Sequence, residues 1–129
     1  MGKNKILIAD DAMISRRMIR TVLGDTLYEF REAGDGNQAL DILKAEGDIA
    51  LVLCDYHMPI SDGLAFVTNK NKYPQLAQIP VVIVSSARSE TIIAEGQRLG
   101  VSRWLLKPFQ PKDLKDIVEE VLAMGSSGA

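Results

Sequence analysis

Three aspartates in this sequence stand where a carboxylate needs an explanation. Asp10 and Asp11 are adjacent and follow the apolar run 5–9, and Asp55 follows the apolar run 49–54. Aspartate is a poor strand residue, and a buried carboxylate is costly. One aspartate of the first pair can cap a helix, but capping does not require two. The alternative is that the three carboxylates together hold a hard divalent cation such as Mg²⁺.

Two more polar residues stand at the ends of apolar runs. Ser85 ends the run 80–85, and Lys107 ends the run 103–107. With a metal in place, Asp55 is a candidate nucleophile toward phosphorus, because carboxylates serve this role in covalent catalysis. A hydroxyl at Ser85 and an ammonium at Lys107 can bind the oxygens of a transferred phosphoryl group. Without their positions at these ends, Ser85 would be an ordinary turn residue and Lys107 an ordinary surface lysine.

Five apolar runs predict the strands that would position these residues, at 5–9, 28–33, 49–54, 80–85 and 103–107. The runs 49–54 and 80–85 are apolar almost throughout, which is typical of strands buried on both faces of a parallel sheet. The run 28–33 alternates and indicates an edge strand. In an open sheet of this kind, ligands bind outside the carboxyl ends of the strands, so the five polar residues are expected to converge there.

Helical patterns separate the runs. Apolar residues recur at helical spacing and are predicted to be core: Ile14, Met18 and Val22, then Ala39, Leu40 and Leu43, and later Leu114, Ile117, Val118, Val121 and Leu122. Helix starts are indicated at Asp35, at Ser61 and Asp62, at Ser89 and at Pro111. Alternating strands and helices with right-handed crossovers predict a three-layer α/β fold of (βα)5 type.

Composition narrows the class of protein. The chain has 129 residues, 47% of them hydrophobic, which suits one packed domain, expected over residues 1–124, with a flexible tail or linker stub at 125–129. Seventeen acidic and fifteen basic residues give a net charge of -2, which argues against nucleic acid or membrane surfaces as partners. The single cysteine, Cys54, lies in an apolar run and is expected in the core. No run is long enough for a membrane span or a signal peptide, so a cytoplasmic protein is expected.

Five motifs, in order, resemble the receiver domain of two-component response regulators, the CheY-like family. They are DD (10–11), EAGDGNQAL (32–40), DYHMPISDG (55–63), VSSA (84–87) and KPF (107–109), and the resemblance covers about residues 3–124. It implies a flavodoxin-like fold with strand order 2-1-3-4-5. It also implies a signalling switch, and not a turnover enzyme, in which Asp55 accepts a phosphoryl group from the phosphohistidine of a sensor histidine kinase or phosphotransfer protein, or from a small acyl phosphate.

The resemblance assigns roles to single residues. Asp11 and Asp55 would bind Mg²⁺ directly, Asp10 through water, and the backbone carbonyl of His57 would complete the protein ligands. Ser85 and Lys107 would move to the phosphoryl oxygens. Trp104 stands at the position of an aromatic switch residue, where the family more commonly has Tyr, Phe or His. The Lys107–Pro108 bond is expected to be cis.

The resemblance also implies how the signal leaves the domain. The expected output face is built from the fourth predicted helix, the fifth strand and the last helix, and its partner would be a target protein or an output domain absent from this sequence. The protein would be a monomer or a phosphorylation-dependent dimer. His57 and Ala87 occupy positions that tune phosphoryl lifetime, and because neither is an amide or acid that orients water, a long-lived phospho-state is predicted. The His57 side chain is expected in solvent, not on a metal.

Three other functions are weighed against the switch. A phosphohydrolase of the haloacid-dehalogenase-like kind also uses an aspartyl phosphate, but it would want D-x-D on the first strand and usually a cap insertion. A binding module that ignores phosphate is disfavoured by the complete set of polar residues. Flavin binding is disfavoured because the segment DDAMIS (10–15) has no Gly- or Thr-rich phosphate loop.

Overall fold

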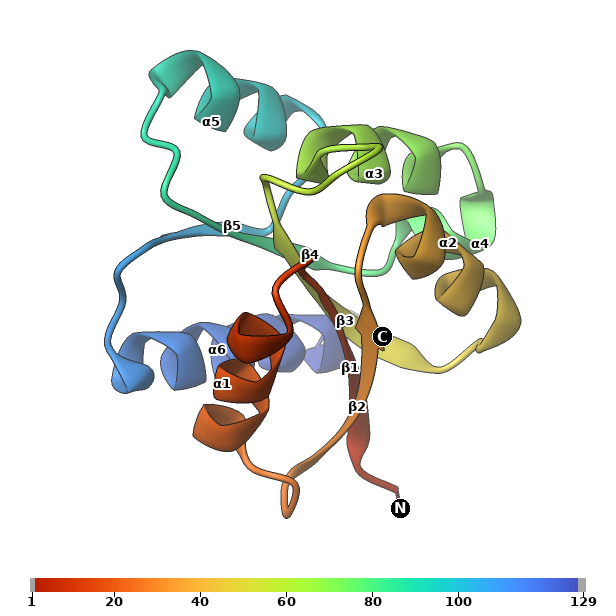
Figure 1. Cartoon of the computed structure of the whole chain (residues 1–129). Helices are drawn as coiled ribbons and strands as arrows, with labels where there is room; N and C mark the ends of the chain where they lie inside the picture. The colour runs from red at the N-terminus through yellow and green to blue at the C-terminus, as the bar shows by residue number, and fades with distance from the viewer. Residues whose placement is uncertain (1, 128–129) are drawn as a thin grey trace.

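The protein is an open sheet of parallel strands with helices on both faces (Figure 1), described over residues 2–127 by a computed structural model. The strands are β1 (Asn4–Ala9), β2 (Tyr28–Ala33), β3 (Ile49–Asp55), β4 (Val81–Ser85) and β5 (Arg103–Leu106). The helices are α1 (Met13–Leu23), α2 (Gly36–Ala45), α3 (Gly63–Asn71), α4 (Pro74–Ala77), α5 (Glu90–Arg98) and α6 (Pro111–Ser127). Each predicted strand is present, with its ends moved by at most one residue.

The strands lie in the order β2-β1-β3-β4-β5, and every neighbouring pair is parallel, which confirms the predicted fold. The sheet separates two apolar cores. One packs residues of α2, α3 and α4 against Leu7, Val52 and Ile83, and the other packs α1 and α6 against Ile6 and Leu53. These alternate residues of the central strands face opposite cores, as the two-residue period of a strand requires. Cys54 is buried in the first core, as predicted.

Three predicted helix starts are confirmed by their caps. The side chains of Asp35, Asp62 and Ser89 accept hydrogen bonds from the backbone N–H groups three residues later. Helix α1 differs, because its N-cap is Ala12 and no side chain caps it. Neither Asp10 nor Asp11 therefore serves as the N-cap of α1, so helix capping does not explain that pair.

The predicted core stripe on α1 is wrong for two of its three residues. Ile14 is 82% exposed and Met18 is 40% exposed, whereas Ile19 and Leu23 are buried. Residues along a helix are separated by about 100°, so a stripe through Ile14 and Met18 lies well to one side of the face that contacts the sheet. Val22 is only partly buried. The stripes on α2 and α6 pack as predicted, with Ala39, Leu43, Leu114, Val118 and Val121 buried.

Two segments differ from the expectations in secondary structure. Helix α4 was not predicted, because four residues opened by Pro74 are too short to show a period. Helix α6 continues through residues 125–127, the first part of the segment expected to be a flexible tail. Gly and Ser lower helix propensity but keep the N–H donor, so they do not stop a helix already formed. Residues 128 and 129 lie outside the described residues.

Lys70 on α3 is the one buried lysine among the described residues, with 2% of its surface exposed. Its ammonium donates to the carbonyl oxygens of Leu76 and Ala77, at 3.2 and 3.0 Å, and to the side-chain oxygen of Asn71 at 3.2 Å. It thereby holds α4 against α3. Burial lowers the pKa of Lys70 from 10.5 to about 8.

This pKa predicts how stability depends on pH. Between pH 8 and 10.5 the unfolded chain retains a proton on Lys70 that the folded chain has lost, so the contribution of Lys70 to the free energy of unfolding rises with pH. We therefore expect the free energy of unfolding of the wild type, minus that of Lys70→Met, to rise by about 2 kcal/mol from roughly pH 7 to 10. Urea denaturation of both proteins at each pH measures it, and the subtraction removes groups common to both. A difference that stays flat would contradict the prediction.

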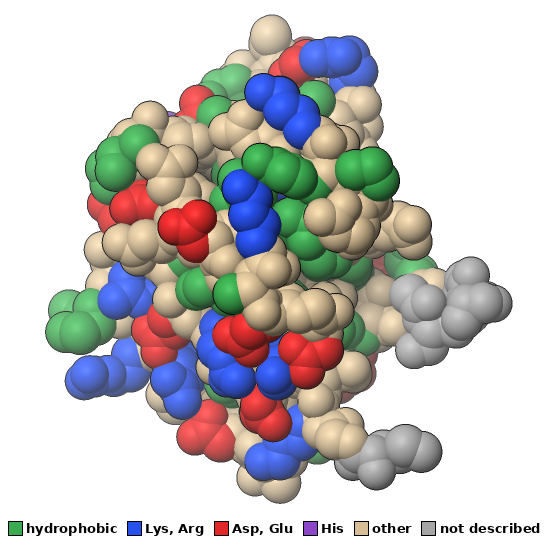
Figure 2. Space-filling model, turned by 90° about the vertical axis from the view of Figure 1, so that its right-hand side faces the viewer, with side chains coloured by type: hydrophobic (Ala, Val, Ile, Leu, Met, Phe, Trp, Pro, Cys, Tyr) green, Lys and Arg blue, Asp and Glu red, His purple; other side chains and the backbone are tan. Residues whose placement is uncertain are grey.

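The surface carries no large patch of a single charge on the face drawn in Figure 2, where basic and acidic side chains are interleaved. Among the ion pairs of the described residues, one network joins Lys5 to Glu46 and Asp48, and Glu46 to Arg31. No helix within residues 2–127 is long and apolar enough to cross a membrane.

Candidate functional site

The predicted carboxylates meet at the carboxyl edge of the sheet. Asp10 and Asp11 follow β1, and Asp55 ends the neighbouring strand β3. Each of the three offers a carboxylate oxygen, and these oxygens lie within 4.8 Å of one another. Asp10 is buried, Asp55 is half-buried and Asp11 is exposed. The cluster is therefore open to solvent on one side and buried on the other.

Lys107 brings a positive charge to this cluster. Its Nζ lies 3.6 Å from Asp55 Oδ2 and 3.9 Å from Asp10 Oδ2. The backbone of Lys107 is fixed by its N–H, which donates to the carbonyl of Ser85 at 2.9 Å. Burial raises the pKa of Asp55 above its ordinary value, Lys107 opposes that shift, and Asp10 adds to it. A cation placed among the carboxylates would favour their charged forms.

Backbone N–H groups orient two of the carboxylates. Asp10 Oδ1 accepts from the N–H of Ala12 at 2.9 Å, and Asp55 Oδ1 accepts from the N–H of His57 at 3.2 Å. The His57 residue is exposed, as predicted, and its ring packs edge-on against Tyr56 with centroids 4.8 Å apart. Aspartates held through the backbone can keep their orientation without a side-chain partner, which suits ligands of an ion.

Ser85 ends β4 at the same edge but is fully buried. Its hydroxyl oxygen accepts from the N–H of Ala87 at 3.0 Å, and the hydroxyl hydrogen remains available for donation. The structure thus places Ser85 on the predicted strand end and covers it. Its contact with a phosphoryl oxygen stays a prediction.

Gly63, whose role was not predicted from the sequence, determines the path of the loop after Asp55. A Cβ at this position would lie 2.8 Å from the carbonyl oxygen of Asp55 and 3.1 Å from the Cα of Tyr56. The N–H of Gly63 donates to the carbonyl of Tyr56 at 2.9 Å. Only glycine allows α3 to start this close to the end of β3. The sequence feature that could have identified Gly63 is its position directly after Asp62, the predicted helix cap.

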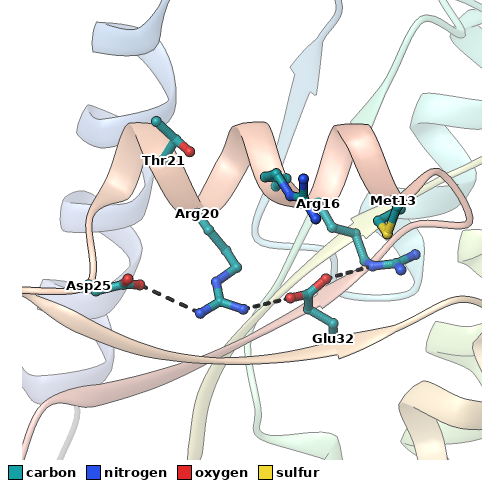
Figure 3. A pocket seen from close by; sticks show the side chains of 7 residues that line it. Met13, Arg16, Arg20, Thr21, Asp25 and Glu32 are labelled. Carbon is teal, nitrogen blue, oxygen red and sulfur yellow. Dashed lines mark hydrogen bonds and ion pairs between the residues drawn. The ribbon is translucent and has the colours of Figure 1, made fainter.

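A clamp of three charged residues holds α1 over β2 (Figure 3). Arg16 Nε and Arg20 Nη1 bind opposite oxygens of Glu32, at 2.8 and 2.7 Å. The hydrogen bond from Arg20 lowers the pKa of Glu32. Arg16 also donates from Nη1 to the backbone carbonyl of Asp10 at 2.6 Å. The clamp lines a cavity of about 360 Å³ and fixes the backbone that carries Asp10.

Trp104 lies on β5, where the predicted switch residue was expected. Its ring packs against Gly96 of α5, where an added Cβ would lie only 3.1 Å from the indole. The centroid of the indole lies 6.1 Å from that of the Tyr56 ring. The indole Nε1 is buried without a hydrogen-bond partner. Tyr56, the residue that follows Asp55, therefore lies between Trp104 and the end of β3. The Lys107–Pro108 peptide bond is cis, as expected.

Both the sequence and the structure of this chain are similar to those of response regulators. The family model of the response regulator receiver domain matches residues 6–119. The two-component response regulator ORR5 of Oryza sativa subsp. japonica is 31% identical over 94% of this chain and 90% of its own. The structure of the chemotaxis protein CheY4 of Vibrio cholerae superposes with a TM-score of 0.86 and 29% identity, covering 93% of this chain and 99% of that one.

A third relative is described with a metal. The Mn²⁺-bound form of the response regulator Rcp1 has a TM-score of 0.77 and 26% identity, and the match covers 92% of this chain and 91% of that one. The family model spans most of the 129 residues and includes the aspartate cluster, Ser85 and Lys107. The chain therefore belongs to the family of response regulator receiver domains.

Proposed function

We propose that this receiver domain is a phosphorylation-dependent switch whose acceptor is Asp55. The observation that carries the proposal is the meeting of three carboxylates and one ammonium at the end of β3, where the Lys107 ammonium lies 3.6 Å from Asp55 and 3.9 Å from Asp10. A carboxylate there has both a nucleophilic oxygen and a neighbouring cation. The proposed donor is the phosphohistidine of a histidine kinase or phosphotransfer protein.

The proposed cofactor is Mg²⁺, held by Asp10, Asp11 and Asp55 together with the backbone carbonyl of His57. Two observations support it: the donor set is entirely oxygen, which hard divalent ions prefer, and a relative is described in a Mn²⁺-bound form. When bound, the ion supplies positive charge that offsets the carboxylates and the incoming phosphoryl oxygens.

The proposed transfer needs no reactant other than Asp55 and the phosphohistidine. A carboxylate oxygen of Asp55 attacks phosphorus and forms an O–P bond as the P–N bond of phosphohistidine breaks. The electron pair of that bond returns to the imidazole, which leaves as a neutral ring because its other nitrogen carries a proton. In the proposed transfer, Lys107 follows the negative charge onto the phosphoryl oxygens and the hydroxyl of Ser85 is a second donor; the 3.6 Å between Lys107 Nζ and Asp55 Oδ2 supports the first role.

The output proposed is the face made by α5, β5 and α6, which contacts a target protein or an output domain. Phosphorylation would replace the carboxylate of Asp55 with a group that carries more negative charge and further acceptor oxygens, and would shift a two-state equilibrium. Trp104 is the proposed reporter of that shift, because its ring touches Gly96 of α5 and approaches Tyr56. A long-lived phospho-state, given His57 and Ala87, and a cytoplasmic location stay predictions.

The test is intact mass after incubation with acetyl phosphate, with Mg²⁺ or with a chelator. We expect one phosphoryl adduct that requires the ion. Well-folded protein that binds Mg²⁺ but forms no adduct would instead identify a phosphate-independent binding module. Release of phosphate far beyond one equivalent would identify a hydrolase.

A further inference from the structure

The backbone of Asp10 is held on both sides by neighbouring elements. Its N–H donates to the carbonyl of Ala33, the last residue of β2, at 3.0 Å. Its carbonyl accepts from Nη1 of Arg16 on α1 at 2.6 Å. That carbonyl belongs to the planar peptide unit that joins Asp10 to Asp11, so its orientation also determines where the Cα of Asp11 lies. A hydrogen bond from Arg16 therefore acts on two members of the carboxylate cluster at once.

Arg16 is itself fixed in place by Glu32 on β2. Its Nε donates to Oε1 of Glu32 at 2.8 Å, and the other oxygen of Glu32 accepts from Nη1 of Arg20 at 2.7 Å (Figure 3). The side chain of Arg16 is 18% exposed, whereas that of Arg20 is 41% exposed. The rigid fork of one guanidinium thus reaches both a carboxylate on β2 and the backbone beside the cluster.

The charge of Arg16 needs an explanation beside a cation site. A second positive charge, in addition to Lys107, opposes the binding of a divalent ion, because like charges repel. Among the described residues, the ion pair of Arg16 is with Glu32, outside the cluster, and its other side-chain hydrogen bond is to a backbone carbonyl. Glu32 offsets the charge of Arg16, so the guanidinium supplies a fixed hydrogen bond with little repulsion.

We propose that Arg16 is a positioning residue for the divalent cation, because its hydrogen bond orients the peptide from which the carboxylates of Asp10 and Asp11 reach the ion. Glu32 holds Arg16 in that orientation. The inference rests on the proposed Mg²⁺ site and adds to it two residues that contact neither the ion nor the phosphoryl group. Groups that orient metal ligands typically contribute about 10- to 100-fold to metal affinity.

The experiment measures Mg²⁺ binding by isothermal titration calorimetry, with no phosphodonor present. Arg16→Met removes both side-chain hydrogen bonds and the charge but keeps an apolar side chain. Arg20→Met is the matched control, because it removes the same charge from the same helix and from the same carboxylate of Glu32. The polar partners of Arg20 are Glu32 and Asp25, and not the backbone of Asp10. Circular dichroism shows which variants are folded.

We expect Arg16→Met to bind Mg²⁺ about tenfold or more weakly than the wild type. Arg20→Met should change the dissociation constant less than about threefold, as expected for a partly exposed ion pair. The sign is diagnostic, because an arginine that acted only through its charge would, when removed, leave a site that binds the cation more tightly. Tighter or unchanged binding in folded Arg16→Met, or an equal loss in Arg20→Met, would overturn the positioning role.

Arg16→Lys keeps the proposal testable if Arg16→Met does not fold. Lysine retains the positive charge but has one nitrogen for the two acceptors that the arginine fork reaches. This variant should therefore also bind Mg²⁺ more weakly than the wild type. Wild-type affinity in Arg16→Lys would show that charge alone is sufficient, and would overturn the inference.

Glu32→Gln tests the part assigned to Glu32. We expect it to weaken Mg²⁺ binding when Arg16 is present, because the guanidinium loses its anionic partner. In the Arg16→Met background the same substitution should have no further effect, since there is no guanidinium left to orient. Losses that add in the double variant would overturn the role of Glu32 as the residue that holds Arg16.

Failure of the proposed function has a different signature. A wild type that does not bind Mg²⁺ would reject the proposed cofactor, and with it the role of Arg16. A wild type that binds Mg²⁺ but forms no adduct with acetyl phosphate would reject Asp55 as the acceptor and leave the role of Arg16 to be decided by the calorimetry of the variants.

Discussion

Asp55→Asn carries no phosphoryl group after incubation with acetyl phosphate and Mg²⁺, because an amide lacks the anionic oxygen that attacks phosphorus. The variant keeps the fold. Burial and the Asp10 carboxylate raise the pKa of Asp55, so ionisation of this carboxyl costs more free energy in the folded protein than in the unfolded chain, and an amide removes that cost. We expect the free energy of unfolding of the metal-free protein to rise. Intact mass and urea denaturation measure the two effects.

The matched control for this variant is Asp62→Asn. Asp62 lies in the same loop and caps α3 through the N–H of Ala65, and asparagine caps helices about as well as aspartate. It should be labelled like the wild type. Labelling of Asp55→Asn at the wild-type rate would show that the acceptor is another residue.

Lys107→Ala separates phosphorylation from its consequence. The ammonium of Lys107 lies within 4.0 Å of the carboxylates of Asp10 and Asp55, so the variant removes this positive charge from beside them. We expect phosphorylation to continue at a rate lower by roughly a hundredfold, the usual effect of losing one donor to a developing charge. The phosphorylated variant should show little change in amide hydrogen exchange across α5, β5 and α6, because the group that follows the charge is missing.

Lys112→Ala is the comparison for that experiment. Lys112 is an exposed lysine on α6 that pairs with Asp116, so its removal changes the net charge equally without touching the site. Exchange in this variant should respond to phosphorylation as in the wild type. A full response in Lys107→Ala would mean that the signal passes from Asp55 by another route.

The fold and the gathering of the site could be predicted because they follow from strong local patterns. Continuous apolar runs identified the central strands, and the carboxyl ends of parallel strands necessarily share an edge, so Asp10, Asp11, Asp55 and Lys107 were expected together. Caps at Asp35, Asp62 and Ser89 followed from the side-chain chemistry of a helix start. The strand order came from resemblance to a family, not from the periodicity.

What could not be predicted depends on tertiary packing. The spacing of Ile14 and Met18 fits a helix face but does not say which face meets the sheet, and the structure turns it outward. The left-handed backbone at Ile60, with a φ of +73°, could not be predicted from a β-branched residue. The full burial of Ser85 could not be read from its place at the end of an apolar run. The clamp from Arg16 to Glu32 joins residues that no motif connects.

Trp104 also provides an intrinsic fluorescence probe in the wild-type protein. It is the only tryptophan in the chain, so the indole emission comes from a single place. That ring lies over Gly96 and 6.1 Å from the ring of Tyr56, the residue that follows the proposed acceptor. A rearrangement of the loop after β3, or of α5, would alter the polarity and quenching around the indole. If the proposed ion binding or phosphorylation rearranges either segment, the fluorescence of Trp104 should change in real time, without a dye or a label.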